Sequence, residues 1–326
     1  MSPATRSADP VAQPAASPEF VVVLGATGTG KSELALDLAE HSTRRGVVAE
    51  IVNADAMQLY RGMDIGTAKL PVAARRGIAH HLLDVLTVRD EASVAEYQTR
   101  ARATIADILD RGRLPILVGG SGLYISSVLY PFTFPGRDPA IRARIEAEAE
   151  HHGTPAMFAR LTRIDPVAAV RIGPHNERRI IRALEVAELS GGSTTGALPD
   201  TTPWRPFRAL GLRRERSELV ARLDARVLGM WRSGLLAEVE TLIDQGLDEG
   251  ATARRAIGYA QARAQLAGEL TEAEAIVDTQ ASTRRYARRQ VSWFRRYQEI
   301  SWLEASSPGL AEEAVAAAGI PWWHEH

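Results

Sequence analysis

A glycine-rich stretch that contains a single lysine is the part of the sequence whose residue types most directly predict chemistry. It reads Gly-Ala-Thr-Gly-Thr-Gly-Lys-Ser over residues 25–32 and fits the spacing G-x-x-x-x-G-K-[ST]. In such a loop the backbone N–H groups wrap around phosphate oxygens, the lysine adds charge, and the hydroxyl reaches a magnesium ion. The sequence therefore predicts a phosphate site with magnesium (Mg2+) held at Ser32, formed by Gly25, Thr27, Gly28, Thr29, Gly30, Lys31 and Ser32.

The segments on both sides of this loop are those that a phosphate loop requires. The apolar run 20–24 precedes it, and residues 33–40 follow with the alternation of an amphipathic helix, whose N-terminus adds partial positive charge. Only two of the 39 basic residues are lysines, Lys31 and Lys69. A compact ammonium suits a phosphate cradle better than a planar guanidinium. We therefore assign Lys31 to the phosphate site. The position of Lys69 can be a coincidence.

The composition sets limits on the possible classes of protein. With 326 residues, of which 45% are hydrophobic, the chain can form one domain with an insertion or two modest domains. The net charge of −1 does not by itself indicate nucleic acid, and the lack of cysteine excludes disulfides, a thiol nucleophile and zinc fingers. Residues 1–18 resemble a disordered tail and not a signal peptide. No run is long enough to span a membrane, so we expect a cytoplasmic protein.

Strand and helix patterns alternate along the chain. Strand patterns occur at 49–52, 80–85, 114–118 and 209–212, and a helix with a Ser-Val-Ala-Glu capping box is expected over 93–111. The alternation predicts an α/β fold, a P-loop NTPase-like doubly wound parallel sheet with a small inserted helical domain. In such a sheet the carboxyl ends of the strands line the ligand crevice. Asp55, just after the second strand, should therefore face the phosphate loop.

The strand at 114–118 ends differently from that of an ordinary ATPase. A carboxylate that holds magnesium is expected there, but the sequence continues Gly-Gly-Ser-Gly. Hydrolysis of phosphate by activated water is therefore not expected. The glycines either let a substrate approach the backbone or only form a turn. The adjacent histidines His80 and His81 point to opposite faces of a strand, which favours a structural role over a metal site.

Turn residues and composition divide the chain into segments. Residues 131–136 are rich in proline and glycine, helical patterns run from 139 to 190, and a flexible linker follows over 190–196. We predict the core over 19–133 and 191–326, interrupted by a helical insertion over 134–190. The second part of the core has a helix over 215–245, with Arg222, Arg226 and Met230 along one stripe, and ends in basic helices.

A basic segment near the C-terminus combines arginines with aromatic residues. Residues 283–297 contain six arginines, and no acid lies between Asp278 and Glu299. As a helix, this segment would place Tyr286, Gln290, Trp293 and Tyr297 along one stripe, with arginines beside it. This arrangement fits phosphate contacts and base stacking on RNA. The alternative is a solvated basic helix with an aromatic core stripe.

Taken together, these segments resemble the bacterial tRNA dimethylallyltransferases, also called tRNA isopentenyltransferases. The stretches that carry the resemblance follow the family's order, from about residue 19 to 300: 25–32, 53–60, 62–69, 80–84, 118–124, 179–185, 256–259 and 284–295. The second, the third and the last are the most diagnostic. The chain has Ala56 for a usual serine, Ser121 for a usual threonine and Ala260 for a longer polar residue. The first exchange removes one hydrogen bond to the target base.

The resemblance implies transfer of a dimethylallyl group from dimethylallyl diphosphate to N6 of adenine 37 in tRNA, with diphosphate as the leaving group. Asp55 would then be the general base, Ser121 would hydrogen-bond the diphosphate, and Arg226 would join its binding site. The implied partners are the tRNA anticodon loop and dimethylallyl diphosphate, without a membrane, and we expect a monomer. The residues implied to contact tRNA are Asp55, Ala56, Met57, Gln58, Ser121, Arg142, Arg178, Arg179, Arg182, Arg255, Gly258, Tyr259, Arg288, Arg289, Gln290, Trp293 and Arg295.

Two alternatives stay open from the sequence. An adenylate isopentenyltransferase would share the phosphate loop and Asp55, but it would need neither the basic segment 284–296 nor a helical insertion. A P-loop small-molecule kinase would need a magnesium carboxylate after Val118, which the sequence lacks.

Overall fold

The computed structural model describes residues 19–132, 134–191 and 202–319. The predicted tail 1–18 and most of the predicted linker lie outside the described residues. The chain divides into two compact units. One comprises the residues up to Leu129 and from Pro203 onward, and the other is Tyr130–Thr202. We describe each unit by itself.

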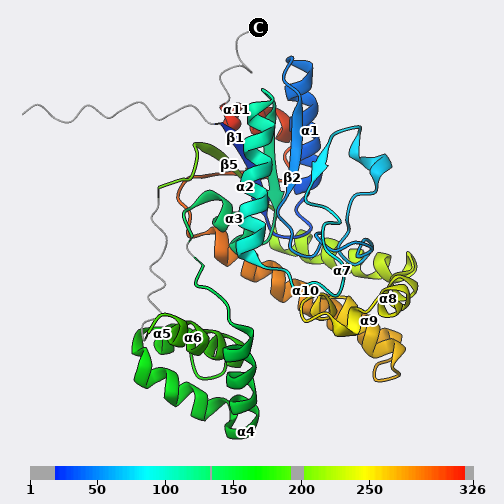
Figure 1. Cartoon of the computed structure of the whole chain (residues 1–326). Coiled ribbons are helices and arrows are strands. Elements are labelled where there is room, and N and C mark those ends of the chain that lie inside the picture. Colours follow the sequence, from blue (N-terminus) through cyan, green and yellow to red (C-terminus); the bar gives the residue numbers. More distant parts are fainter. Residues whose placement is uncertain (1–18, 133, 192–201, 320–326) are drawn as a thin grey trace, which may run out of the picture. The chain divides into compact units, whose positions relative to one another are not determined.

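The first unit, the core, is built on a six-stranded sheet whose strands all run parallel, in the order β3-β2-β4-β1-β5-β6 (Figure 1). The central strand β1 (Phe20–Gly25) pairs with β4 (Leu114–Gly119) and β5 (Phe207–Arg213), with Val21 opposite Ile116 and Val23 opposite Val118. The remaining strands are β2 (Ala49–Asn53), β3 (His80–His81) and β6 (Ile300–Glu304). The chain reverses direction across the sheet at β1 and β4, so the ligand crevice is expected at their carboxyl ends.

Helices cover both faces of this sheet, which explains why β1 and β4 are apolar throughout. Val21 and Val23 belong to a buried cluster with residues of α1 (Lys31–Arg44) and α11 (Leu310–Ala318). The alternate residue Val22 is equally buried on the other face. There α2 (Val94–Asp110) contacts β2 and β4 and packs against α3 (Gly122–Leu129). The predicted N-cap of α2 is confirmed, since the Ser93 side chain accepts a hydrogen bond from the Glu96 N–H.

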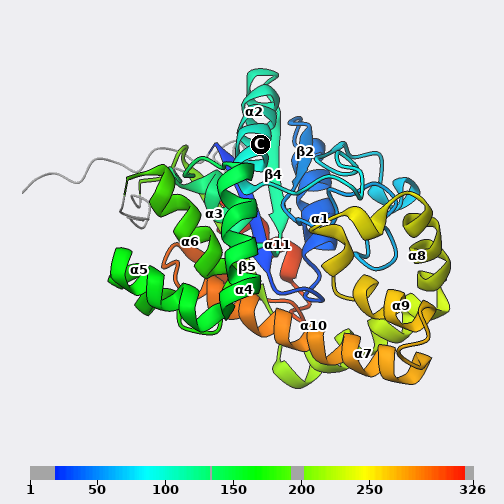
Figure 2. The ribbon, with the colours of Figure 1, turned by 60° about the horizontal axis from the view of Figure 1, so that its bottom comes forward.

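A group of helices from the second half of the chain packs beside the carboxyl ends of the strands. It comprises α7 (Arg216–Arg232), α8 (Leu235–Asp244), α9 (Tyr259–Leu266) and α10 (Glu272–Phe294), with short 3-10 turns at Leu247–Glu249 and Ala253–Arg255. A further 3-10 turn, Val72–Arg75, lies between β2 and β3. The long helix α10 contacts α7 and α9 (Figure 2). The prediction of one helix over 215–245 is wrong. Gly234 adopts a φ of 94° and separates α7 from α8.

The second unit, the helical unit, consists of α4 (Pro139–Ile164), α5 (Pro166–Ile172) and α6 (Glu177–Leu189). The helix α4 is interrupted at Gly153, whose φ of 78° and ψ of 160° are not helical, two residues before a proline. The helical pattern predicted from residue 139 onward is thereby observed with a break at Gly153. The unit has its own apolar core, formed by residues such as Ile145, Leu161 and Leu184. Its helices begin with side-chain caps from Asp138, Asp165 and Asn176.

Candidate active site

The loop after β1 has the backbone geometry of an anion cradle. Gly25 has a φ of 148°, and a Cβ atom there would lie 2.5 Å from the Leu212 carbonyl oxygen, so no other residue fits. The loop continues through two further glycines with positive φ, and α1 begins at Lys31 with Gly30 as its N-cap. The N-terminus of α1 therefore points free N–H groups and its partial positive charge at the space in front of the loop.

Lys31 places a buried ammonium group in this loop. Its Nζ donates a hydrogen bond of 2.7 Å to the Ala26 carbonyl. Burial lowers the pKa of Lys31 to about 8, Asp55 opposes this shift, and Arg226 adds to it. The three groups therefore lie close enough to influence one another's charge. Below pH 8 the site has two cations that face one carboxylate.

Arg226 reaches the same site from α7. Its Nη1 donates to Thr27 Oγ1 at 3.0 Å and its Nη2 donates to the Thr67 carbonyl at 3.2 Å. Burial lowers the pKa of Arg226, and Asp55 opposes the shift. Four residues earlier on α7, Arg222 donates from Nε to the Gly28 carbonyl at 3.3 Å. Arg222 was not predicted to belong to the site, although its helical spacing from Arg226 places the two side chains on the same stripe of α7.

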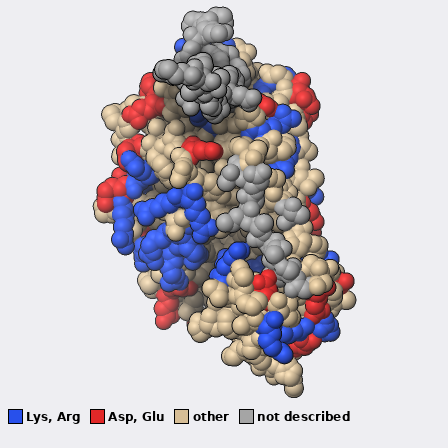
Figure 3. All heavy atoms as spheres, turned by 90° about the vertical axis from the view of Figure 1, so that its left-hand side faces the viewer, with Lys and Arg blue, Asp and Glu red and all other residues tan. Residues whose placement is uncertain are grey.

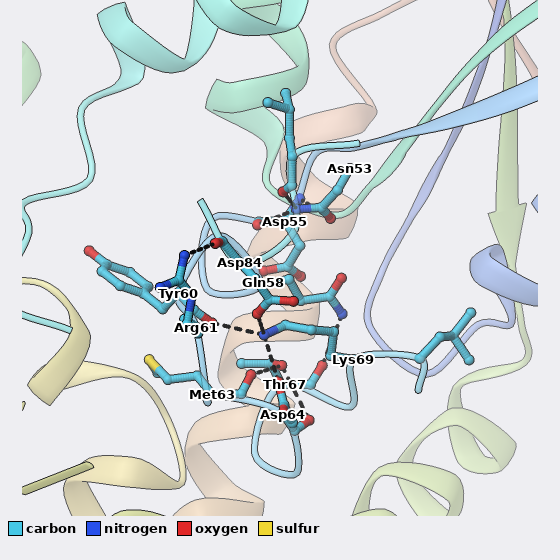
Figure 4. Close-up of polar contacts among 12 residues, drawn as sticks. Asn53, Asp55, Gln58, Tyr60, Arg61, Met63, Asp64, Thr67, Lys69 and Asp84 are labelled. Atoms are coloured by element: carbon cyan, nitrogen blue, oxygen red, sulfur yellow. Dashed lines mark hydrogen bonds and ion pairs between the residues drawn. The ribbon is translucent and has the colours of Figure 1, made fainter. Parts of the chain in front are cut away.

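Asp55 follows β2 and is oriented by the strand's last residue. Asn53 Oδ1 accepts a hydrogen bond from the Asp55 N–H at 3.0 Å, and Asn53 Nδ2 donates to the Leu82 carbonyl at 3.0 Å (Figure 4). Asp55 Oδ1 accepts from the Met57 N–H, also at 3.0 Å. The carboxylate is thereby fixed, with its charge facing Lys31 and Arg226. Asn53 is a functional residue that sequence reasoning missed.

Ser121 follows β4 and joins the ends of two strands. Its Oγ accepts a hydrogen bond of 3.2 Å from the Ala56 N–H. Gly119 explains why these ends can approach so closely, because a Cβ atom at Gly119 would overlap the backbone of Ala54. The hydroxyl of Tyr286 on α10 also interacts with Ser121. Burial and the nearby Asp55 raise the pKa of Tyr286 to about 12, so the phenol stays protonated at neutral pH.

Two cavities meet at these residues. The first has a volume of about 710 Å³ and is lined by the phosphate loop, including Lys31 and Ser32. The second, about 300 Å³, is lined largely by apolar side chains, with Ser121, Arg255 and Arg289 also on its wall. Four residues line both cavities: Thr27, Asp55, Thr67 and Arg226. The apolar side chains of the second cavity include Met57, Leu223, Val227, Met230, Ile257 and Tyr286.

Three residues that the resemblance assigned to tRNA make contacts within the fold. Gln290 is only 4% exposed, and its amide accepts from the Thr27 N–H at 2.9 Å and donates to the Gly120 carbonyl at 2.8 Å. Tyr259 is 1% exposed and donates its hydroxyl to Glu238 at 2.5 Å. Trp293 packs on Gly122 and donates from Nε1 to Ser126 at 3.1 Å. Gln290 and Trp293 of the predicted stripe thus pack within the fold, whereas Tyr286 of the same stripe lines the second cavity.

The arginines of α10 lie outside that stripe, and several of them are exposed. Arg288 and Arg295 are exposed, and among the described residues neither forms an ion pair. Arg289 lies over the Tyr286 ring at 5.8 Å. Arg284, in contrast, pairs with Asp224 at 2.5 Å. Figure 3 shows basic side chains gathered into a cluster on one face of the molecule. The exposed side of α10 is thus positively charged.

In the helical unit two of the four predicted arginines are neutralised. Arg142 pairs with Glu146 at 2.7 Å and with the buried Glu185, which also pairs with Arg182 at 2.9 Å. Arg178 and Arg179 are exposed, and no ion pair to either is found within the described part of the chain. These two remain the candidates of the unit for contact with a phosphate. Gly258, also predicted to contact tRNA, forms the N-cap of α9 through its backbone.

The second lysine of the chain has a defined place, so its position is not accidental. The Lys69 side chain is 3% exposed, and Nζ donates to the Tyr60 carbonyl at 2.8 Å, to Asp64 at 2.7 Å and to Asp84 at 2.6 Å (Figure 4). It therefore fixes the loop that carries Thr67. His81 bonds to Glu50 at 2.6 Å, and His80 to the Ile78 carbonyl at 2.8 Å.

The fold and the site together define a P-loop protein in which a phosphate cradle opens into an apolar cavity, with a fixed carboxylate between them. A family model described as IPP transferase matches residues 58–297. The chain belongs to this family.

Proteins that are similar in sequence or in structure match nearly the whole chain. A tRNA dimethylallyltransferase of Clavibacter sepedonicus is 60% identical over 91% of this chain and 97% of its own length, and one of Thermobifida fusca is 52% identical over 91% and 93%. The tRNA isopentenylpyrophosphate transferase of Bacillus halodurans has a similar solved structure, with a TM-score of 0.63, 36% identity and coverage of 88% and 90%. A eukaryotic dimethylallyltransferase acting on tRNA has a TM-score of 0.76 at 27% identity, over 92% and 78%.

These findings confirm the predicted family, the fold class and the assignment as a transferase of the tRNA-modifying type. Among the described helices, none combines the length and the apolar character needed to cross a membrane.

Proposed function

We propose that the protein transfers a dimethylallyl group from dimethylallyl diphosphate to the exocyclic N6 of adenine 37 in the tRNA anticodon loop and releases diphosphate. The observation that carries this proposal is the pair of cavities that meet at Asp55 and Arg226. A prenyl diphosphate needs a cationic site for its head beside an apolar site for its tail. The acceptor base must reach the carbon that joins them, close to a group that can take its proton.

The phosphate cavity fits the diphosphate head. Lys31, Arg226 and the loop N–H groups would stabilise the charge that develops on the leaving oxygen as the C–O bond breaks. The described residues contain no group of three or more His, Asp or Glu that could hold a metal. A magnesium ion would therefore be held by the Ser32 hydroxyl and mainly by the oxygens of the diphosphate. When bound, it would neutralise further charge on the leaving group.

The Asp55 carboxylate, where the two cavities meet, is suited to take a proton from the acceptor base. The N6 amine is a poor nucleophile, since its lone pair is delocalised into the adenine ring. As N6 forms its bond to the prenyl carbon, Asp55 would accept the N6 proton. The Ser121 hydroxyl, fixed by the Ala56 N–H, would donate to the diphosphate near the breaking bond. The electron pair of that bond leaves with the diphosphate, so the step balances without another reactant.

Exposed arginines are suited to bind the phosphate groups of the RNA. Arg255 and Arg289 line the apolar cavity, and Arg288 and Arg295 lie on the exposed side of α10. Phosphate groups would bind there, while the target base enters the cavity. The base must leave its stack, which costs a few kcal/mol or less in a single-stranded loop. We expect a monomer that acts in the cytoplasm.

The decisive experiment is incubation of the protein with labelled dimethylallyl diphosphate and magnesium, separately with total tRNA, AMP and ATP. Label is expected in tRNA, and digestion should recover it on N6 of an adenosine next to the anticodon. The variant Asp55→Ala provides the inactive control. Label in AMP but not in tRNA would instead indicate an adenylate isopentenyltransferase, and hydrolysis of ATP alone would indicate a kinase-like protein.

A further inference from the structure

The loop 63–69 forms part of the wall of both cavities, and the family resemblance gave it no role beyond its sequence pattern. Its contribution to the site is the Thr67 carbonyl oxygen. That oxygen accepts a hydrogen bond from Gln58 Nε2 at 3.2 Å (Figure 4). It also accepts one from Arg226 Nη2, again at 3.2 Å. The loop thus holds one of the two acceptors that fix the Arg226 guanidinium.

Arg226 depends strongly on these two acceptors. Nη1 has Thr27 Oγ1 at 3.0 Å and Nη2 has the Thr67 carbonyl, while the buried Nε has no hydrogen-bond partner among the described residues. A long side chain with four rotatable bonds is then held by two neutral acceptors. The orientation of the Arg226 guanidinium towards the phosphate cavity therefore depends on the position of Thr67.

The loop itself is held from two sides by charged groups. On one side lies Lys69, with its bonds to Asp64, Asp84 and the Tyr60 carbonyl. On the other side lies Glu238 of α8, which accepts from the Ile65 N–H at 2.8 Å and from the Gly66 N–H at 3.4 Å.

The Glu238 carboxylate is itself fixed. It accepts the Tyr259 hydroxyl at 2.5 Å, and the Tyr259 ring packs directly on Gly66, where any Cβ atom would overlap it. The contact with Gly66 presses the turn 65–67 against α9, and the carboxylate binds its two successive N–H groups. A carboxylate that accepts backbone N–H groups forms a charge-assisted bond, which is stronger than a neutral one.

We infer that Glu238 is a positioning residue for the diphosphate: it holds the turn 65–67, and through the Thr67 carbonyl it aligns Arg226 with the phosphate cavity. Glu238 lies in neither cavity wall, so it acts through the groups that it binds, the turn 65–67 and the Tyr259 hydroxyl. This inference rests on the proposed role of Arg226 as a ligand of the diphosphate.

The test measures binding of inorganic diphosphate with magnesium by calorimetry, which needs neither tRNA nor turnover. Glu238→Gln keeps the size of the side chain but exchanges one acceptor oxygen for a donor. We expect about tenfold weaker binding, the effect of one charged hydrogen bond. Glu240→Gln, an exposed glutamate on the same helix, is the matched control and should bind as the wild type does.

A double-mutant cycle with Arg226→Gln shows whether Glu238 acts through Arg226. In the Arg226→Gln background, Glu238→Gln should change diphosphate affinity less than twofold. Binding of tRNA to Glu238→Gln should stay unchanged. If that variant does not fold, Glu238→Asp, which keeps the charge but cannot span both N–H groups, takes its place.

Two outcomes would overturn the inference: wild-type affinity in Glu238→Gln, or an equal loss with and without Arg226. Absence of diphosphate binding in the wild-type protein would be a different result. It would contradict the proposed function itself.

Discussion

Positive charge is used differently in the cavity and on α10. In the cavity, Lys31 and Arg226 are buried, their pKa values are lowered by that burial, and both are close to Asp55. On α10, Arg288 and Arg295 are exposed to water. Under the proposed function, this comparison predicts a division of labour, in which the buried charges act on the reaction and the exposed charges act on binding of tRNA.

The physical reason is the dielectric environment. A charge inside a protein interacts several times more strongly with its neighbours than one at the surface, and salt hardly screens it. Exposed arginines each contribute little, and their contribution falls with ionic strength. Changes in the cavity should therefore have large effects that depend on pH, and changes on α10 should have small effects that depend on salt.

The largest effect is expected for Asp55→Ala. Loss of the general base should lower turnover about 10²- to 10⁴-fold. Binding of tRNA should change little, because that affinity comes from the exposed arginines. Single-turnover measurement at saturating tRNA, together with a binding titration, checks both parts. An unchanged rate would remove Asp55 from the mechanism, and an equal loss of affinity would contradict the division of labour.

The second largest effect concerns the charge of Lys31. Its pKa is lowered to about 8, so it is charged below pH 8 and loses its charge as the pH rises through that value. Diphosphate should thus bind most tightly below pH 8, and its dissociation constant should increase towards pH 9. Lys31→Met should bind about 10- to 100-fold more weakly below pH 8. The pH dependence that remains in Lys31→Met is that of the diphosphate itself, so this variant serves as the control.

The phosphate cavity could be predicted from the sequence, because the backbone geometry of a phosphate loop is set by residues that are close together in the chain. The order of strand, loop and helix around residues 25–32 suffices for it, and the parallel sheet then places Asp55 in front of the loop. The roles on α10 could not be predicted. A stripe of aromatic and amide side chains fits a buried face and an RNA-binding face equally well. The tertiary contacts of Gln290 with Thr27 and Gly120, which bury this side chain, cannot be deduced from the pattern.

Glu238 shows a second limit of sequence reasoning. Its partners Ile65 and Gly66 are more than 170 residues away in the chain. No spacing rule connects such residues. The break between α7 and α8 at Gly234 was, in contrast, visible in the sequence, but a glycine inside an amphipathic pattern does not always end a helix.

A smaller effect is expected on α10. Replacement of Arg288 or Arg295 by glutamine should each reduce the slope of log affinity for tRNA against log salt by about 0.7, the value for one phosphate contact on single-stranded RNA. Diphosphate binding should stay unchanged, and stability should change by less than about 0.5 kcal/mol. Arg284→Gln, on the same helix, is the matched control because Arg284 pairs with Asp224. A slope that Arg288→Gln leaves intact would mean that this arginine is only solvated surface.

The smallest effect is expected in the helical unit, where the same residue type is neutralised by glutamates. Arg160 pairs with both Glu148 and Glu188, so its charge is already compensated and few counterions are released from it. Arg160→Gln should leave the salt slope for tRNA unchanged and lower the stability by at most about 1 kcal/mol, as is usual for partly exposed ion pairs. Arg178→Gln is the informative partner variant, since Arg178 is exposed and forms no ion pair within the described residues. If Arg178 touches the RNA backbone, only its loss should flatten the slope. If both variants flattened it equally, ion pairing would not distinguish the arginines that bind RNA from those that stabilise the fold.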